Sequence, residues 1–126
     1  IAGAYKDLKG SASTFTPVNL LNAKLKSGAN VEFSFPKNYN TALLVIEGSI
    51  IVNGSEKAPT DNFVLMANDG EDFNIKAQDD AVVLVLSGEP IDEPIAAHGP
   101  FVMNTRQEIE QAFEDFNKGR FGYLED

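Results

Sequence analysis

Apolar and polar residues alternate with a period of two along short stretches of the chain before residue 90, a pattern typical of β-strands with one buried face. The stretches from Leu21 to Leu25 and from Val31 to Phe35 both alternate in this way, and Gly28 between them suits a turn. Phe73 and Ile75 continue the alternation further along the chain. The pattern predicts a strand in each of these stretches.

A second kind of strand signal is a short run of β-forming residues without alternation. Thr41–Ile46 is such a run, and Glu47-Gly48 separates it from Ser49–Val52, which we interpret as a hairpin. Asn53-Gly54 follows directly and favours a type I′ turn, because both central positions of that turn need a positive φ. These residues therefore predict three consecutive strands joined by tight turns.

Two further runs complete the predicted β region. Phe63–Met66 is a short apolar strand, and Asp69-Gly70 is a turn. Ala81–Leu86 is apolar at every position, which predicts a strand buried on both faces. Seven or eight short strands with turn signals at intervals of roughly 8–12 residues indicate an all-β sandwich or barrel. A jelly-roll barrel fits better than an immunoglobulin-like domain, because the chain has no tryptophan and no cysteine.

One helix is predicted near the C-terminus. Thr105 and Glu108 form a capping box, with Thr105 as the N-cap. The apolar residues that follow lie at helical spacing on one face: Ile109, Ala112, Phe113 and Phe116. Gly119 suits the position just beyond the helix. The pattern predicts an amphipathic helix over Arg106–Lys118.

The length of 126 residues fits one domain. We divide it into a lead-in segment at 1–16, a barrel at 17–90, an extended arm at 91–104, a helix region at 105–119 and a tail at 120–126. The chain begins with Ile1 rather than methionine, and no signal-peptide pattern starts there. We therefore expect a fragment of a longer protein, or a chain from which a leading segment was cleaved.

Composition removes several function classes. No apolar run approaches the roughly 20 residues that cross a bilayer. The absence of cysteine excludes disulfides and thiolate metal sites, and a single histidine excludes a site built from several histidines of one chain. The net charge of −9 repels phosphate backbones and anionic lipid, so direct binding to nucleic acid or to a membrane is not expected.

The titratable residues offer no catalytic set. His98 has no second histidine to complete a metal site, and we interpret it as a loop histidine that is solvated or singly hydrogen-bonded. The acidic pairs are interpreted as turn and surface charge, because neighbours along a strand point to opposite faces; these pairs are Glu71-Asp72, Asp79-Asp80, Asp92-Glu93 and Glu125-Asp126. No nucleophile motif or phosphate-binding loop is present. We predict no catalytic, cofactor-binding or metal-binding residue in this chain.

The C-terminal region is rich in aromatic side chains for a small domain. One interpretation is an arm that lies across the barrel and leads into the helix. The other is a surface that contacts a second domain, because exposed apolar patches usually mark interfaces. The predicted interdomain contacts are Phe101, Met103, Phe113, Phe116, Phe121 and Tyr123.

The order and spacing of four C-terminal segments resemble the pirin family. The segments are Ser87–Ile95, His98–Thr105, Glu108–Phe116 and Gly119–Gly122. The residues before them agree more loosely, and Glu47-Gly48 is similar to a hairpin found in many cupins. The resemblance covers nearly the whole chain but only the second half of a pirin.

The resemblance implies a cupin-type jelly-roll β-barrel with a C-terminal helix. Pirins are bicupins: the N-terminal half carries a metal, usually iron, on histidines and a glutamate, and the C-terminal half generally lacks the site and packs against the first. Counting from the cupin glycines places Phe35 and Lys37 near two ligand histidines, Thr41 at the glutamate and Phe73 at the last histidine. The resemblance therefore implies a packed interior without metal, and no family catalytic residue carries over to this chain.

Three functions remain open from the sequence. The first is a structural or interaction role, with the N-terminal cupin domain of the same protein or another protein as partner and with iron or another divalent metal confined to that missing domain. The second follows family members that resemble quercetin 2,3-dioxygenases: the chain is then the non-catalytic half of such an enzyme. The third is a stand-alone binding module. We expect a cytoplasmic protein, or a nuclear one if it is eukaryotic, since the animal pirin is described as a nuclear co-regulator.

Overall fold

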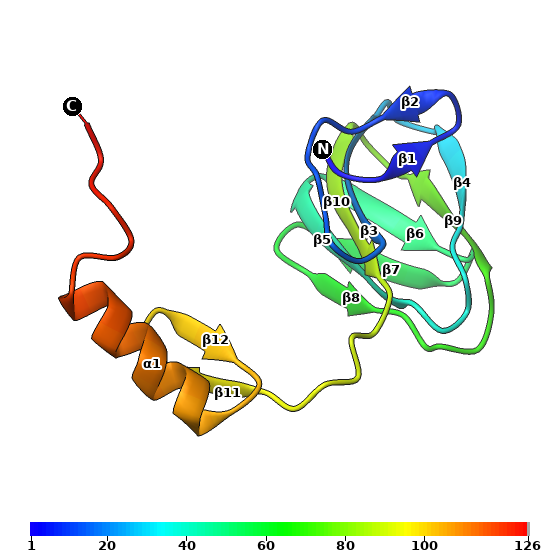
Figure 1. Ribbon diagram of the computed structural model, residues 1–126. Helices are drawn as coiled ribbons and strands as arrows, with labels where there is room; N and C mark the ends of the chain where they lie inside the picture. The colour runs from blue at the N-terminus through cyan, green and yellow to red at the C-terminus, as the bar shows by residue number, and fades with distance from the viewer. Residues whose placement is uncertain (126) are drawn as a thin grey trace. The chain divides into compact units, whose positions relative to one another are not determined.

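The structure is a computed structural model that describes residues 1–125 and contains two compact units, which meet in the sequence between Pro90 and Ile91 (Figure 1). Nearly all of its regular structure is β, and one helix lies in the second unit. The prediction of a mostly β chain with a C-terminal helix is confirmed. No helix among the described residues has the length and apolar character needed to cross a membrane.

The first unit is built from two antiparallel four-stranded sheets. The β10 sheet has the order β3 (Val18–Leu25), β10 (Ala81–Gly88), β5 (Asn40–Glu47) and β8 (Phe63–Leu65). The β9 sheet has the order β4 (Asn30–Ser34), β9 (Asp72–Ala77), β6 (Ser49–Val52) and β7 (Glu56–Pro59). A hairpin of β1 (Ala4–Tyr5) and β2 (Leu8–Lys9) precedes them in the chain.

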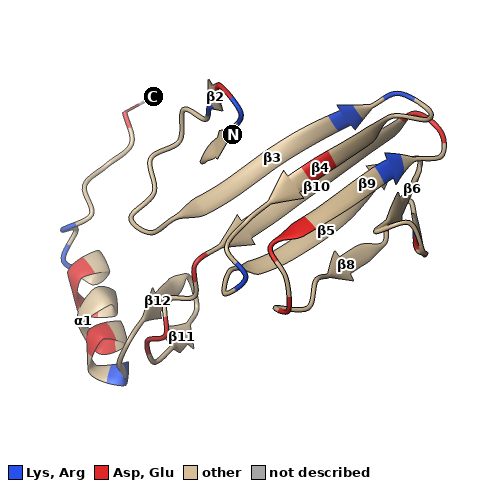
Figure 2. Cartoon of the chain, turned by 90° about the vertical axis from the view of Figure 1, so that its right-hand side faces the viewer, with Lys and Arg blue, Asp and Glu red and all other residues tan. Residues whose placement is uncertain are grey.

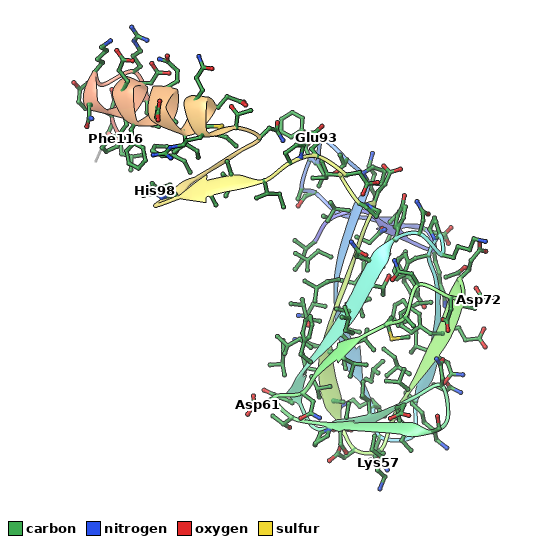
Figure 3. All side chains as sticks on the ribbon, turned by 90° about the horizontal axis from the view of Figure 1, so that it is seen from below. Lys57, Asp61, Asp72, Glu93, His98 and Phe116 are labelled. Carbon is green, nitrogen blue, oxygen red and sulfur yellow. The ribbon has the colours of Figure 1, made fainter. Side chains whose placement is uncertain are left out.

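The core of this unit lies between the two sheets, where side chains from both fill the space (Figure 3). The largest side chains that are almost completely buried come from both: Leu43, Val45, Val83 and Val85 from the β10 sheet, and Ile50 and Ile75 from the β9 sheet. Burial along β10 alternates: Val83 and Val85 are buried, whereas Leu84 and Leu86 are half-buried. The prediction that this strand is buried on both faces is wrong, because only its inward face is fully covered.

The predicted hairpin at Glu47-Gly48 is not formed. β5 belongs to the β10 sheet, while β6 pairs with β7 and β9 in the other sheet. Gly48 lies where the chain crosses between the sheets, with a φ of 72°. A Cβ atom there would lie 2.3 Å from the carbonyl oxygen of Asp80, so the close approach requires glycine.

The predicted turn at Asn53-Gly54 is present between β6 and β7. Asn53 and Gly54 have φ values of 50° and 73°. The amide of Ser55 donates a hydrogen bond to the carbonyl of Val52 at 3.2 Å, which closes the turn. Because Val52 pairs with Glu56, the connection contains one residue more than a two-residue hairpin loop.

The two sheets are separate hydrogen-bonded arrays within the described residues, so closure into a barrel stays a prediction. A cavity of about 1210 Å³ lies between their edge strands β3 and β4 and is also lined by the β1–β2 hairpin. The open space at these edges agrees with a sandwich in which the edge strands do not pair.

The second unit contains a hairpin and a helix that pack together (Figure 1). Within the range predicted as an extended arm, β11 (Ala96–His98) pairs with β12 (Phe101–Met103). The helix α1 (Arg106–Asn117) begins at the N-cap Thr105, whose Oγ1 accepts a hydrogen bond from the amide of Glu108 at 3.2 Å. It ends one residue before the predicted end, with Lys118 as C-cap. The predicted tail reaches Asp126, which lies outside the described residues.

Candidate functional site

The four positions that the cupin pattern assigns to metal ligands line one cavity. Phe35 and Lys37 follow β4, Thr41 lies on β5 and Phe73 lies on β9, so both sheets contribute. The cavity has a volume of about 450 Å³. Spacing along the chain therefore located a real convergence of residues in space, and the identity of those residues decides what the cavity can hold.

Two of the four positions, Phe35 and Phe73, belong to an aromatic cluster of the core. The ring centroids of Phe33 and Phe73 lie 5.4 Å apart, those of Phe35 and Phe73 6.1 Å, and that of Tyr5 5.2 Å from Phe33. All three phenylalanines are buried. Phenyl rings at these distances stabilise one another through offset and edge contacts, and they carry no lone pair for a metal. Two of the positions that hold ligands in the cupin pattern are therefore part of the hydrophobic core of this chain.

The remaining two positions do not supply ligands either. The Thr41 hydroxyl and the Ser87 hydroxyl are 2.8 Å apart and share a hydrogen bond inside the β10 sheet. Lys37 carries an exposed ammonium group, which repels a cation. Divalent iron and related metals prefer imidazole and carboxylate ligands. The residues at this place therefore do not fit a divalent metal ion.

The other titratable candidates are dispersed. Among residues 1–125, no group of three or more His, Asp or Glu side chains is arranged to hold a metal ion. His98 is exposed at the end of β11 (Figure 3). Its ring lies edge-on to Phe113 with centroids 5.5 Å apart. The described acidic pairs are exposed at strand ends and loops. The pair Glu125-Asp126 extends beyond the described residues.

Several of these carboxylates hold turns together. Asp79 accepts a hydrogen bond from the amide of Ser49 at 2.7 Å, and Asp80 accepts one from the amide of Ser27 at 2.9 Å. Glu93 accepts one from the side chain of Asn104 at 2.9 Å. These contacts tie connecting segments to one another and do not converge on a site.

The predicted interdomain residues gather largely in one cluster of the second unit. Phe101 lies 4.9 Å from Phe113 and 5.8 Å from Phe121, and Phe116 lies 6.0 Å from Phe121, between ring centroids. Phe116 and Phe121 remain 60% and 58% exposed. Met103 lies on β12, and Tyr123 in the tail is 92% exposed. These aromatic rings contact one another within the second unit, and their contact with another domain stays a prediction.

A second apolar surface was not predicted. It covers the outward face of the β10 sheet, and we call it the outer face. Its apolar residues are Val18 and Leu20 on β3, Val82, Leu84 and Leu86 on β10, Ala42, Leu44 and Ile46 on β5, and Phe63 and Leu65 on β8. The signal was present in the sequence, because Ala81–Leu86 is apolar at inward and outward positions alike.

Comparison with known proteins gives a consistent result. The family model described as the Pirin C-terminal cupin domain matches residues 20–122. A Pseudomonas aeruginosa protein named as a candidate quercetin 2,3-dioxygenase is 41% identical over 121 residues, which cover 96% of this chain and 42% of that protein. Mouse pirin is 32% identical, over 98% of this chain and 44% of its own length. The chain thus spans less than half the length of these relatives.

Solved structures agree with the sequence comparison. The crystal structure of a protein titled quercetin 2,3-dioxygenase from Acinetobacter baumannii superimposes with a TM-score of 0.88 at 40% identity. The match covers 98% of this chain and 43% of that one. The chain is therefore similar, in sequence and in fold, to one half of a longer protein.

Proposed function

The chain belongs to the pirin family, as its C-terminal cupin domain, and from that premise we propose that it acts as the metal-free half of a two-domain protein. In this role it packs against an N-terminal cupin domain that carries iron or another divalent metal. Its own contribution is structural: it completes the fold of the full-length protein and presents surface to its neighbour. The chain by itself performs no chemistry.

The observation that carries this proposal is the residue set around the 450 Å³ cavity. A cupin metal centre needs imidazole and carboxylate ligands in this place, and the chain has Phe35, Lys37, Thr41 and Phe73 there. The two phenyl rings are buried in the core, and the Thr41 hydroxyl shares a hydrogen bond with the Ser87 hydroxyl. None of these side chains offers a metal ion an imidazole or carboxylate ligand.

The second support is the length of the relatives. Each of them has more than half of its residues outside the region that matches this chain, as the coverage of 42% and 43% shows. That remainder is long enough for a second cupin domain. We place the metal site, and any reaction it supports, in that second domain.

A specific observation favours an alternative for the parent protein. The names of the Pseudomonas and Acinetobacter relatives both refer to quercetin 2,3-dioxygenase. If the full-length protein oxidises flavonols, this chain is the non-catalytic half of that enzyme. The structural role of the chain is the same in both cases, and only the activity of its neighbour differs.

The test compares two proteins: the 126-residue chain alone and the full-length polypeptide that carries it. Both proteins are incubated with Fe²⁺ and desalted, and the bound iron is then measured by inductively coupled plasma mass spectrometry. We expect stoichiometric metal in the full-length protein only. Thr41→Val changes a residue of this domain's cavity, and we expect it to leave the metal content of the full-length protein unchanged. Stoichiometric metal on the isolated chain would contradict the proposal.

Quercetin consumption in the same samples separates the two versions of the proposal. Turnover by the full-length protein that is lost on chelation supports the enzyme. A full-length protein that holds iron and leaves quercetin intact favours the structural and regulatory role.

A further inference from the structure

We propose that the edge of the sandwich between β3 and β4 binds an extended, acidic segment of a partner protein, which pairs with β4 as an added strand. The inference goes beyond the proposed function, because the partner is a separate protein and the surface is a strand edge. Three observations at the 1210 Å³ cavity between these strands carry it: free backbone groups, half-buried apolar walls and a local excess of lysine.

β4 is the terminal strand of the β9 sheet, so one of its two edges has no partner strand within residues 1–125. Just beyond β4, the amide of Phe35 donates a hydrogen bond to the carbonyl of Glu71, at 3.0 Å, on the β9 side. Successive residues of a strand direct their amide and carbonyl groups to opposite sides. Asn30, Glu32 and Ser34 therefore direct theirs away from β9, toward the free edge.

These free backbone groups of β4 have little to displace before a peptide can pair with them. Among the described residues, one hydrogen bond reaches them, from the Tyr5 hydroxyl to the carbonyl oxygen of Glu32 at 3.5 Å. That distance is long for an O–H···O hydrogen bond, so the contact is weak. Unpaired strand edges are the places at which extended peptides add to sheets.

The opposite wall of the cavity is also an open strand edge. On the side of β3 away from β10, Leu20 exchanges two backbone hydrogen bonds with Ala2, at 3.0 and 3.2 Å. Asn22 and Lys24 direct their backbone groups the same way, but no described residue pairs with them. The two sheets thus face each other here across the cavity, without a hydrogen-bonded ladder between them.

The inward apolar side chains of both edge strands are incompletely covered. Leu21 on β3 and Val31 on β4 pair with Val85 and Ile75, which are completely buried. Leu21 and Val31 share that inward face, yet they are only half-buried, as is Ala23. An added strand directs every second side chain toward these walls, so apolar residues at those positions become buried.

Charge at the cavity differs in sign from the charge of the whole chain. Three lysines line the cavity against two carboxylates, although the chain carries a net charge of −9; these residues are Lys6, Lys9, Lys24, Glu32 and Asp72. β3 and β4 each carry a single charged residue, Lys24 and Glu32 (Figure 2). The local excess of lysine favours a peptide with carboxylates, with an uncharged residue opposite Glu32.

A second copy of this chain is a poor occupant. Antiparallel pairing of two β4 strands about their central residue places Glu32 of one copy directly opposite Glu32 of the other, where like charges are destabilising. The net charge of −9 on each copy also opposes association. The cavity therefore fits a partner of different sequence, with apolar and polar residues in alternation and carboxylates at its ends.

The test uses the peptide acetyl-Glu-Val-Thr-Phe-Glu-amide, which matches the five residues of β4. Its valine and phenylalanine take the inward positions, its threonine lies opposite Glu32, and its glutamates supply the charge. One control peptide is methylated on the backbone nitrogens of its glutamates and threonine, which removes the hydrogens that pair with β4. A second control carries lysine in place of both glutamates. Each peptide is titrated into the full-length protein, and NMR follows the chemical shift and hydrogen exchange of single amides.

We expect the acidic peptide at saturation to slow hydrogen exchange of the Asn30, Glu32 and Ser34 amides by about tenfold or more. The amides of Val31 and Phe33 already face β9, so their exchange should not change. Both control peptides should bind about tenfold or more weakly than the acidic peptide. Equal binding of the methylated peptide, or no effect of the acidic peptide up to about 10 mM, overturns the inference.

Two substitutions at one position separate backbone pairing from charge. Glu32→Pro removes an amide hydrogen that bonds to no other strand, which an edge strand tolerates, and should weaken peptide binding about tenfold or more. Glu32→Gln keeps that hydrogen and should bind the peptide at least as tightly as the unchanged protein. Near-native circular dichroism is required of both variants, and equal affinities for the two would contradict pairing at this edge.

The lysines provide a test that does not depend on the proline variant. The double variant Lys6→Gln, Lys24→Gln should bind the acidic peptide about tenfold more weakly, because two charges at the cavity are lost. Lys57→Gln removes a charge from β7, at the opposite end of the β9 sheet, and should leave the affinity unchanged. If Glu32→Pro is misfolded, this comparison decides, and equal affinities for the double variant and Lys57→Gln overturn the inference.

Hydrogen exchange without peptide identifies the other possible occupants. If the Asn30, Glu32 and Ser34 amides are protected in the full-length protein but not in the 126-residue chain, the rest of the polypeptide covers this edge. The inference then fails, and the proposed function stands. Protection in the 126-residue chain that rises with protein concentration indicates a second copy and also overturns the inference.

Discussion

The hydroxyl groups of Thr41 and Ser87 lie 2.8 Å apart, on paired positions of β5 and β10, and both side chains are buried. Thr41 occupies the position that the cupin pattern gives to a metal-binding glutamate. In this chain the Thr41 hydroxyl instead shares a hydrogen bond with the neutral Ser87 hydroxyl. A potential ligand position has thus become part of the sheet's internal structure.

Thr41→Val removes one partner of this hydrogen bond without changing the side-chain shape. We expect the free energy of unfolding to fall by about 1–3 kcal/mol, because the buried Ser87 hydroxyl loses its partner. Chemical denaturation of the single variants Thr41→Val and Ser87→Ala and of the double variant measures the coupling. The double variant is expected to lose less than the sum of the two single losses; full additivity would show that the hydroxyls do not interact.

The crossing at Gly48 provides a test with an internal control. Gly48 and Gly54 have nearly equal φ values of 72° and 73°, but a Cβ atom at Gly54 would meet nothing within 4 Å. Gly54→Ala should cost about 1–2 kcal/mol, the usual cost of a left-handed alanine. Gly48→Ala should cost clearly more, about 3 kcal/mol or above, because the methyl group meets the backbone of Asp80. Equal losses for the two variants in thermal unfolding would contradict the steric explanation.

The N-cap of α1 can be removed on its own. Thr105→Ala takes away the acceptor for the Glu108 amide and should destabilise the helix by about 1 kcal/mol. Thr105→Ser keeps the hydroxyl and should restore most of that loss. Hydrogen exchange of amides in α1 is the suitable measurement, because the change is local to the second unit. Faster exchange confined to the first unit would be inconsistent with this role.

Asp115, in the C-terminal turn of α1, is a carboxylate whose pKa is lowered by its neighbours. The hydrogen bond from Gln111, at 2.9 Å, together with the hydrogen bond and charge of Arg120, holds the pKa of Asp115 below its ordinary value. A depressed pKa stabilises the folded state above the ordinary pKa, and the contribution is lost as pH falls through the lowered value. The contacts of Asp115 therefore survive at neutral pH and weaken only in acid, below about pH 4.

An NMR titration of the Asp115 carboxyl group checks this cause. Gln111→Ala should raise the pKa toward the ordinary value, and Arg120→Ala should also raise it. Gln107→Ala, a matched change elsewhere on the same helix, should leave it in place. A pKa of Asp115 that Gln111→Ala does not move would show that the amide hydrogen bond is not its cause.

Local features were predictable because their causes are local. The hydroxyl of Thr105, the glycine at position 119 and the Asn53-Gly54 pair each specify backbone geometry within a few residues. Strand positions followed from alternation for the same reason. The helix end was placed to within one residue, since capping requires the chain to stop there.

Partner choice between strands was not predictable in the same way. Thr41–Ile46, Glu47-Gly48 and Ser49–Val52 have the same local pattern whether the chain turns back on itself or crosses to another sheet. The crossing is decided by pairing with β9, whose residues lie more than 20 positions further along the chain. The outer face was missed for a related reason: an apolar run indicates that both faces of a strand avoid water, but not what covers the second face.

At the candidate site, the family spacing led to four residues that the structure does bring to one cavity. What spacing could not supply was the state of their side chains. The contact of Phe35 with Phe73 and the hydrogen bond between Thr41 and Ser87 join residues that lie far apart along the chain. In the structure, Phe35 and Phe73 belong to the hydrophobic core, Thr41 belongs to a hydrogen bond inside the β10 sheet, and a cavity of about 450 Å³ remains beside them.

The pairing of β3 with β10 also has a consequence for how the domain assembles. These strands come near the beginning and the end of the first unit, yet they pair along their whole length, from Val18 with Gly88 to Leu25 with Ala81. Such long-range pairing is slow to form, with folding times of about milliseconds to seconds for β-rich domains. β3 and β5 do not pair with each other, because both pair with β10, which lies between them. During synthesis, β3 therefore has no partner in this sheet until residues 81–88 have been made. β10, the last strand of the sheet to be made, then joins β3 to β5.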